Sequence, residues 1–163
     1  MSTNSQENDA PKTDIVAALS PEEIETGVRF RYAMKVELAM SVDGLSPDWA
    51  ARETAYFVKR TPEGGGQWYL ARVGGKFVGS ACAFIDDSWF TTLLQRPQLG
   101  WIIGVYVLPE YRRHGIARAL TEAAVSWLRR AGCSEVKLHA SPFGRGIYES
   151  LGFARTYEMK LKL

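Results

Sequence analysis

The segment 105–120 reads VYVLPEYRRHGIARAL, and it decides the fold. Its first residues close an apolar, β-branched run, which predicts a buried strand over 99–107 that ends before Pro109. From 115 to 131 apolar and small residues recur at helical spacing and are followed by a glycine, so we expect a helix there. The basic turn 112–114 joins the strand to the helix.

This turn has the features of an anion site. The first amides of a helix lack partners and lie at the positive end of its dipole, which favours a phosphate or pyrophosphate. Gly115 and Ala117 let a ligand approach the backbone, and Arg112, Arg113 and Arg118 add positive charge. The segment contains neither GxxxxGK[ST] nor GxGxxG. Taken alone, it is also compatible with a solvated basic turn.

A second segment, 138–153, reads LHASPFGRGIYESLGF. It follows a short apolar run that predicts a strand over 136–140. Residues 146–151 are expected to form a short helix that carries Tyr148 and stops at Gly152.

Together the two segments resemble the GCN5-related N-acetyltransferase (GNAT) family. The stretch 112–117 matches the family pattern Arg/Gln-x-x-Gly-x-Gly/Ala, and 148–153 (YESLGF) matches Tyr-x-x-x-Gly-Phe. The clear similarity covers residues 99–155, and the amino-terminal half is similar in the order of its elements only.

The remaining elements follow from hydrophobic spacing and turn signals. Helices are expected to begin at Ser20-Pro21, with apolar residues every fourth position up to Met40, and at Ser46-Pro47, ending near Pro62. Further strands are expected at 15–19, 67–73, 76–85 and 153–163.

The order β-α-α-β-β-β-α-β-α-β predicts an α/β fold (α+β by some schemes), with a mixed, mostly antiparallel sheet flanked by helices. By resemblance the sheet is GNAT-like and splays between its fourth and fifth strands. Residues 1–13 are expected to be a flexible tail and 14–163 a single acetyltransferase domain.

The resemblance implies that acetyl-CoA is the co-substrate and binds between strands 99–107 and 136–140. Backbone groups of Val105 and Val107 would pair with the pantetheine arm, and the amides of 113–118 would hold the pyrophosphate. Ser141 stands where many relatives have Asn, and it would either replace that contact or cap the next helix. The full set of expected cofactor residues is Val105, Tyr106, Val107, Arg112, Arg113, His114, Gly115, Ile116, Ala117, Arg118, Ser141 and Tyr148.

The reaction expected is direct attack of a primary amine of a small molecule or peptide on the thioester. Tyr148 is the candidate general acid, because a phenol keeps its proton at neutral pH and can donate it to a thiolate. The backbone amide of Val107 is the candidate oxyanion donor. Two general bases stay open, Glu53 and His139. Gly104 marks a bulge or leaves room for the acceptor.

The acceptor wall is expected to include the aromatic residues Trp49, Tyr56, Phe57 and the pair Trp89-Phe90. Residues 1–98 carry 10 Lys/Arg against 13 Asp/Glu, whereas 99–163 carry 10 against 5. We therefore expect the basic part to hold the phosphates, and we hypothesise that an acidic front favours an amine. The alternative function is a CoA-binding regulatory or interaction domain without catalysis.

Composition restricts the other partners. A net charge of +2 and 46% apolar residues indicate a globular chain and predict neither nucleic-acid nor membrane binding. Two isolated cysteines, Cys82 and Cys133, predict no metal site and favour the cytoplasm, where thiols stay reduced. Homodimers are common in the family, so the resemblance leaves a homodimer open.

Overall fold

The computed structural model describes residues 12–86 and 99–161. Its elements follow the expected order up to the last helix: β1 (Thr13–Ala17), α1 (Pro21–Glu37), α2 (Trp49–Arg60), β2 (Gly66–Val73), β3 (Lys76–Ile85), β4 (Leu99–Val107), a 3₁₀ turn (Pro109–Tyr111), α4 (Ile116–Arg130), β5 (Glu135–Leu138) and α5 (Arg145–Ser150).

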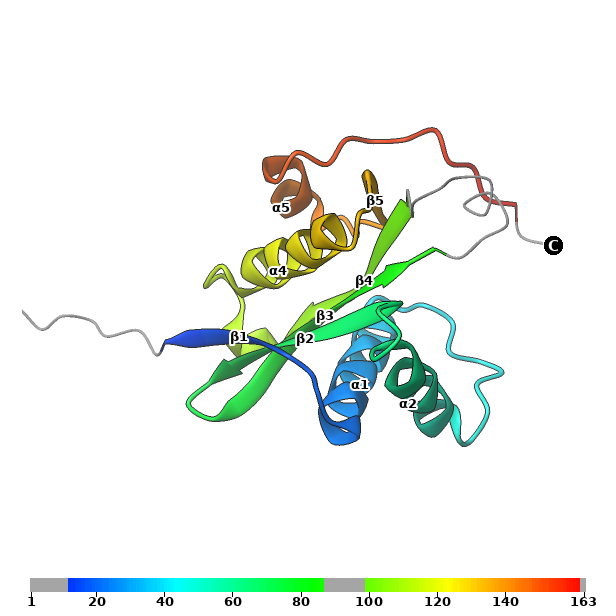
Figure 1. The fold of residues 1–163 in the computed structure, drawn as a ribbon. Coiled ribbons are helices and arrows are strands. Elements are labelled where there is room, and N and C mark those ends of the chain that lie inside the picture. Colours follow the sequence, from blue (N-terminus) through cyan, green and yellow to red (C-terminus); the bar gives the residue numbers. More distant parts are fainter. Residues whose placement is uncertain (1–11, 87–98, 162–163) are drawn as a thin grey trace, which may run out of the picture.

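The five strands form one sheet in the order β1-β2-β3-β4-β5. The first three pairings are antiparallel, and β4 pairs with β5 in parallel. Helices α1 and α2 cover one face of the sheet and α4 covers the other, with α5 beyond α4 (Figure 1). This arrangement confirms the predicted mixed sheet flanked by helices.

Each face of the sheet has its own core. Leu120, Ala124 and Leu128 of α4 are buried on one face. On the other face the ring of Phe57 from α2 packs edge-on against Trp68 of β2, at 5.5 Å between centroids. Both cores pack on the central strands of the sheet. Helices therefore hold β4 in position on both faces of the sheet.

Helix α1 begins as predicted and ends earlier than predicted. Ser20 and Glu23 form the capping box, in which Ser20 Oγ accepts from the Glu23 amide and the Glu23 carboxylate accepts from the Ser20 amide. The fourfold apolar repeat predicted a helix up to Met40, but α1 ends at Glu37 and the Met40 side chain is half exposed. Of that repeat, only Ile24 and Val28 are buried.

The last strand was predicted over 153–163, and the part of this range that the structure describes contains no strand. Residues 153–161 form no strand, and the alternating side chains of Tyr157, Met159 and Leu161 are fully or nearly fully exposed. Alternation sets which side chains share a face, but a strand also needs a neighbour to pair with. Within the described chain, β5 pairs only with β4. Most of the expected flexible tail, residues 1–11, lies outside the described residues, and Thr13 already belongs to β1.

The close approach of α1 to β2 predicts a stability effect. A Cβ at Gly27 would lie 2.4 Å from Trp68 Cε3, so Gly27→Ala should lower the free energy of unfolding by about 1–3 kcal/mol. The matched control is Gly146→Ala, because a Cβ there would meet nothing within 4 Å. Urea denaturation of both variants measures the difference, and equal midpoints would contradict the packing described.

Candidate active site

Strands β4 and β5 diverge about halfway along β4. They pair over Leu99–Ile102 and Glu135–Leu138 only, so the last five residues of β4 have no β5 partner. The Leu108 amide donates to Val78 O of β3 (2.8 Å). Because successive amides of a strand point to opposite sides, the Val107 amide faces the gap that β5 leaves. This divergence is the predicted splay.

A bulge lies at the start of the unpaired part of β4. Gly104 adopts a φ of +63°, and the β3–β4 register shifts between Ser80 and Cys82. The buried Ser80 hydroxyl donates to Gly104 O (3.0 Å) and holds the distortion in place. The expected bulge is thus confirmed.

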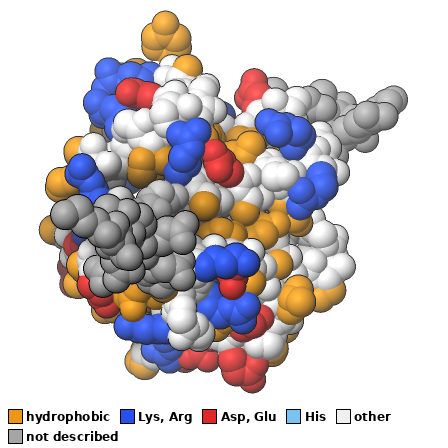
Figure 2. Space-filling view, turned by 90° about the vertical axis from the view of Figure 1, so that its left-hand side faces the viewer, with side chains coloured by type: hydrophobic (Ala, Val, Ile, Leu, Met, Phe, Trp, Pro, Cys, Tyr) orange, Lys and Arg blue, Asp and Glu red, His pale blue; other side chains and the backbone are white. Residues whose placement is uncertain are grey.

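The turn after β4 exposes backbone donors. Arg113 and Gly115 both adopt left-handed conformations, with φ of 68° and 75°. The Ala119 amide makes a helical bond to Gly115 O, and no side chain caps α4. The amides of Ile116 and Ala117 therefore lack helical acceptors, as an anion site requires. Figure 2 looks onto the side of the molecule where α4 begins, and Lys and Arg side chains border a band of apolar surface there.

The Arg112 side chain braces the turn. Its Nε donates to Val107 O (2.9 Å), its Nη2 donates to Glu37 Oε2 of α1 (2.7 Å), and the guanidinium lies over the Tyr106 ring. The Arg112 guanidinium thus lies at the turn, as expected, but it is paired with Glu37 and Val107 O. His114 is exposed, and its Nδ1 lies 3.3 Å from Tyr111 O.

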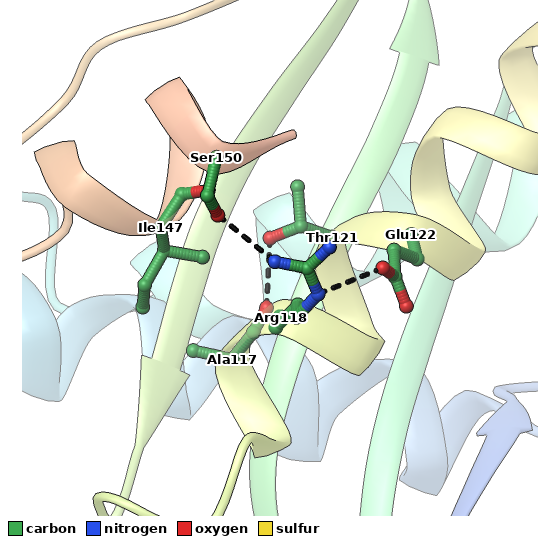
Figure 3. A network of polar contacts seen from close by, with 6 residues as sticks. All are labelled: Ala117, Arg118, Thr121, Glu122, Ile147 and Ser150. Carbon is green, nitrogen blue, oxygen red and sulfur yellow. Dashed lines mark hydrogen bonds and ion pairs between the residues drawn. The ribbon is translucent and has the colours of Figure 1, made fainter. Parts of the chain in front are cut away.

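The Arg118 side chain joins the turn to the helix that carries Tyr148 (Figure 3). Its Nη1 donates to Ser150 Oγ of α5 (2.9 Å), and its Nε donates to Glu122 Oε1 (3.0 Å). Ser150 in turn donates to Ile147 O (2.7 Å). The distance between the amides at the start of α4 and α5 is thus held by hydrogen bonds rather than by apolar packing alone.

Tyr148 is buried, with 9% of its surface exposed. Burial raises the pKa of its phenol above the ordinary value, so the group is protonated at neutral pH. The ring packs edge-on against Phe153, and a Cβ at Gly144 would lie 2.9 Å from it. Ser141 Oγ accepts from the Gly144 amide (3.2 Å) in the turn before α5, whereas no side chain caps α5 itself.

The two candidate bases lie in different surroundings. Glu53 accepts from Arg31 Nη1 (2.5 Å) and lines a pocket of about 250 Å³ between α1, α2 and the sheet. His139 lies just beyond β5, is mostly exposed, and has Nε2 3.4 Å from Glu158 Oε1. The structure therefore does not bring the two candidates into one cluster.

The pocket beside Glu53 contains part of the predicted acceptor wall. Tyr56 and Phe57 line it, whereas Trp49 stacks on Tyr32 with 4.6 Å between ring centroids. The predicted pair Trp89-Phe90 lies outside the described residues. The sequence analysis missed Arg31, because its pairing with a residue 22 positions away leaves no signal in the sequence.

Two features are absent from residues 12–86 and 99–161. No group of three or more His, Cys, Asp or Glu side chains is placed to hold a metal ion. No helix in those residues is both long and apolar enough to cross a membrane.

Comparison with known proteins identifies the family to which the chain belongs. The family model described as Acetyltransferase (GNAT) family matches residues 36–153. The match covers most of the chain, including the bulged β4, the turn and α5. The protein belongs to the GNAT acetyltransferase family.

Particular relatives show how far the similarity extends. The chain is 29% identical over 91 residues to aminoglycoside N(6')-acetyltransferase type 1 of Salmonella typhimurium, covering 54% of this chain and 62% of that one. It is 30% identical over 114 residues to N-alpha-acetyltransferase 30 of Schizosaccharomyces pombe, covering 68% and 71%. The matched part thus spans about three fifths of the first of these relatives.

The fold is also similar to solved structures. A predicted acetyltransferase of Clostridium acetobutylicum, solved with acetyl-CoA, superposes with a TM-score of 0.75 over 93% of this chain and 96% of that one. The two sequences are 21% identical, so this comparison supports the fold.

The brace between Arg112 and Glu37 predicts a pH effect. The hydrogen bond from Arg112 lowers the pKa of the Glu37 carboxyl below its ordinary value of 4.5. A lowered folded-state pKa contributes stability above the unfolded-state pKa, and that contribution is lost as the pH falls through the folded value. Because the pair is partly exposed, the contribution should stay below about 1 kcal/mol.

Carboxyl-detected NMR titration of the protein and of Arg112→Gln measures this effect. The pKa of Glu37 should rise in the variant, and the difference in unfolding free energy between the two proteins should shrink below pH 4. A pKa of Glu37 that is the same in both proteins would contradict the brace.

Proposed function

We propose that this protein is an N-acetyltransferase that moves an acetyl group from acetyl-CoA to a primary amine. The proposal rests on one observation. Backbone N–H donors follow one another from the Val107 amide, which has no β5 partner, to the amides at the start of α4. Family membership and the relatives' names support the same reaction class.

The residues fit acetyl-CoA by their chemistry. The amides of 113–118 would hold the pyrophosphate, and the basic side chain of Arg113 lies on the same turn. The Val105 backbone and the Val107 amide would pair with the pantetheine arm as an added strand. Val107 O already accepts from Arg112, so the amide is the group left for the ligand. Acetyl-CoA, when bound, supplies the thioester acetyl group.

The chain's own groups would then handle charge and protons. The Val107 amide would donate to the oxygen that becomes negative during attack. Tyr148 would give its proton to the leaving thiolate, a role that its buried, protonated phenol supports. Of the two candidate bases, Glu53 is the better supported because it lines a pocket beside β4, whereas His139 does not.

Tyr148→Phe tests the proposal. It should lower kcat at least about tenfold and leave the Kd of acetyl-CoA nearly unchanged, because the phenol acts on the leaving group and not on binding. Thiol release with a panel of amines gives kcat, and calorimetry gives Kd. An unchanged kcat would remove Tyr148 from the mechanism. Acetyl-CoA binding without thiol release on any amine would favour the CoA-binding regulatory domain instead.

We also infer a homodimer. The exposed side chains of Tyr157, Met159 and Leu161 support it, as does a hollow of about 250 Å³ beside β5 that is lined by Val136 and Phe153 among others. A second copy is the occupant that offers the matching segment and the matching hollow at once.

Light scattering tests the dimer with the double variant Met159→Asp/Leu161→Asp. The protein should have the mass of a dimer and the variant that of a monomer. The control is Leu19→Asp, because Leu19 is similarly exposed but lies at the start of α1. A monomeric mass for the unchanged protein would overturn the assembly.

The free thiols of Cys82 and Cys133 support a cytoplasmic location.

A further inference from the structure

The pocket between α1, α2 and the sheet holds a charged pair within apolar walls. Arg31 from α1 donates to Glu53 from α2, and both side chains are about one quarter exposed. Tyr56, Phe57, Phe84 and Ile103 form the rest of the lining. Arg31 Cβ would lie 3.2 Å from a Cβ at Gly104, so the pair stands directly over the β4 bulge.

The charged residues at this pocket include a cation as well as a carboxylate, whereas the sequence suggested an acidic front. Lys35 lies one helical turn after Arg31 on α1. Burial lowers the pKa of Lys35, and the nearby Arg31 lowers it further while Glu53 opposes the change, so all three charges interact. Among the residues that line the pocket, one cation (Arg31) therefore faces one carboxylate (Glu53), and Lys35 lies close enough for its charge to interact with both.

The pair leaves donors and acceptors available. An arginine has five N–H donors, and within the described residues Arg31 uses only Nη1, toward Glu53 Oε1. The second carboxylate oxygen of Glu53 has no protein donor in the same residues. A guanidinium with free N–H groups thus lies beside a carboxylate with a free oxygen, which complements a molecule carrying both a carboxylate and an ammonium group.

We propose that the acceptor is a free α-amino acid with an apolar or aromatic side chain. Its carboxylate binds Arg31, its ammonium group binds Glu53, and its side chain contacts the aromatic wall. This inference rests on the proposed acetyl transfer. A volume of about 250 Å³ is below the usual range for drug-sized ligands, which favours a small acceptor. Arg31 in the lining and Lys35 nearby disfavour a polycationic acceptor.

The transfer balances on these groups. The ammonium group loses a proton to the Glu53 carboxylate, and the freed nitrogen lone pair attacks the acetyl carbon. The nitrogen–carbon bond forms, the carbon–sulfur bond breaks, and the thiolate takes its proton from Tyr148. The acylated nitrogen then loses its second proton, which restores the Tyr148 phenol by way of solvent, and Glu53 returns its proton to bulk water. The products are an N-acetyl amino acid and CoA.

A matched set of amines tests the acceptor class. Thiol release is measured with acetyl-CoA and phenylalanine, with β-phenylethylamine, which lacks only the carboxylate, and with kanamycin, a polycation. We expect kcat/KM for phenylalanine to exceed that for β-phenylethylamine at least tenfold, because charge-assisted hydrogen bonds to the carboxylate are lost. Equal or better turnover of either other amine would overturn the inference and leave the proposed function standing. Release with none of the amines would overturn both.

The variant Arg31→Met tests the assigned residue. It should raise the KM for phenylalanine about tenfold or more and bring the preference over β-phenylethylamine close to one, with the KM for acetyl-CoA unchanged. The control is Arg29→Met, since Arg29 lies on the same helix and pairs with Glu25 at the surface. Arg31→Lys keeps the charge without the planar fork and should restore part of the preference, which also covers misfolding of the methionine variant. A preference retained in Arg31→Met would contradict the assignment.

Discussion

The rest of the structure depends on one feature, the divergence of β4 from β5. Four residue pairs join the two parallel strands, and β4 then continues alone. A strand with an unpaired side presents amides and carbonyls that need partners, and a ligand can supply them. Because α4 covers one face and α1 the other, β4 cannot move to satisfy these groups within the protein. The fold therefore provides an open backbone edge between two rigid layers.

Several side chains keep this edge in place. Arg112 reaches back from the turn to Val107 O and across to Glu37, so that the end of β4, the turn and α1 are connected. Arg118 performs the equivalent task toward α5. Bracing of this kind suits a site whose groups must be held near a reacting centre, since fixed dipoles need no reorganisation during the reaction.

Much of the fold could be predicted, because its signals are local. The capping box of α1 and the strand–turn–helix over 99–131 depend on neighbouring residues only. The bulge at Gly104 has a local signal, the glycine itself, although Ser80 of β3 holds it in place. The end of α1 and the missing final strand could not be predicted, because both depend on partners elsewhere. The repeat up to Met40 and the alternation of Tyr157 and Leu161 describe potential faces, and only packing decides whether a face is used.

The same distinction between local signals and long-range contacts applies to the candidate site. The backbone positions of the turn and the place of Tyr148 on a short helix were inferred from motifs. The use of the Arg112 guanidinium and the pairing of Arg31 with Glu53 are long-range contacts across 75 and 22 positions. Net charge cannot locate an acceptor site for the same reason, because a count over 98 residues does not say which charges meet at the pocket.

Amide hydrogen exchange at Val107, followed by NMR with and without acetyl-CoA, tests the central claim most directly. In the free protein the Val107 amide should exchange fast, while the Leu108 amide, bonded to β3, should exchange slowly. Saturation with acetyl-CoA should slow Val107 and leave Leu108 unchanged. Slow exchange at Val107 in the free protein, or fast exchange that persists at saturation, would contradict the open edge as the binding element.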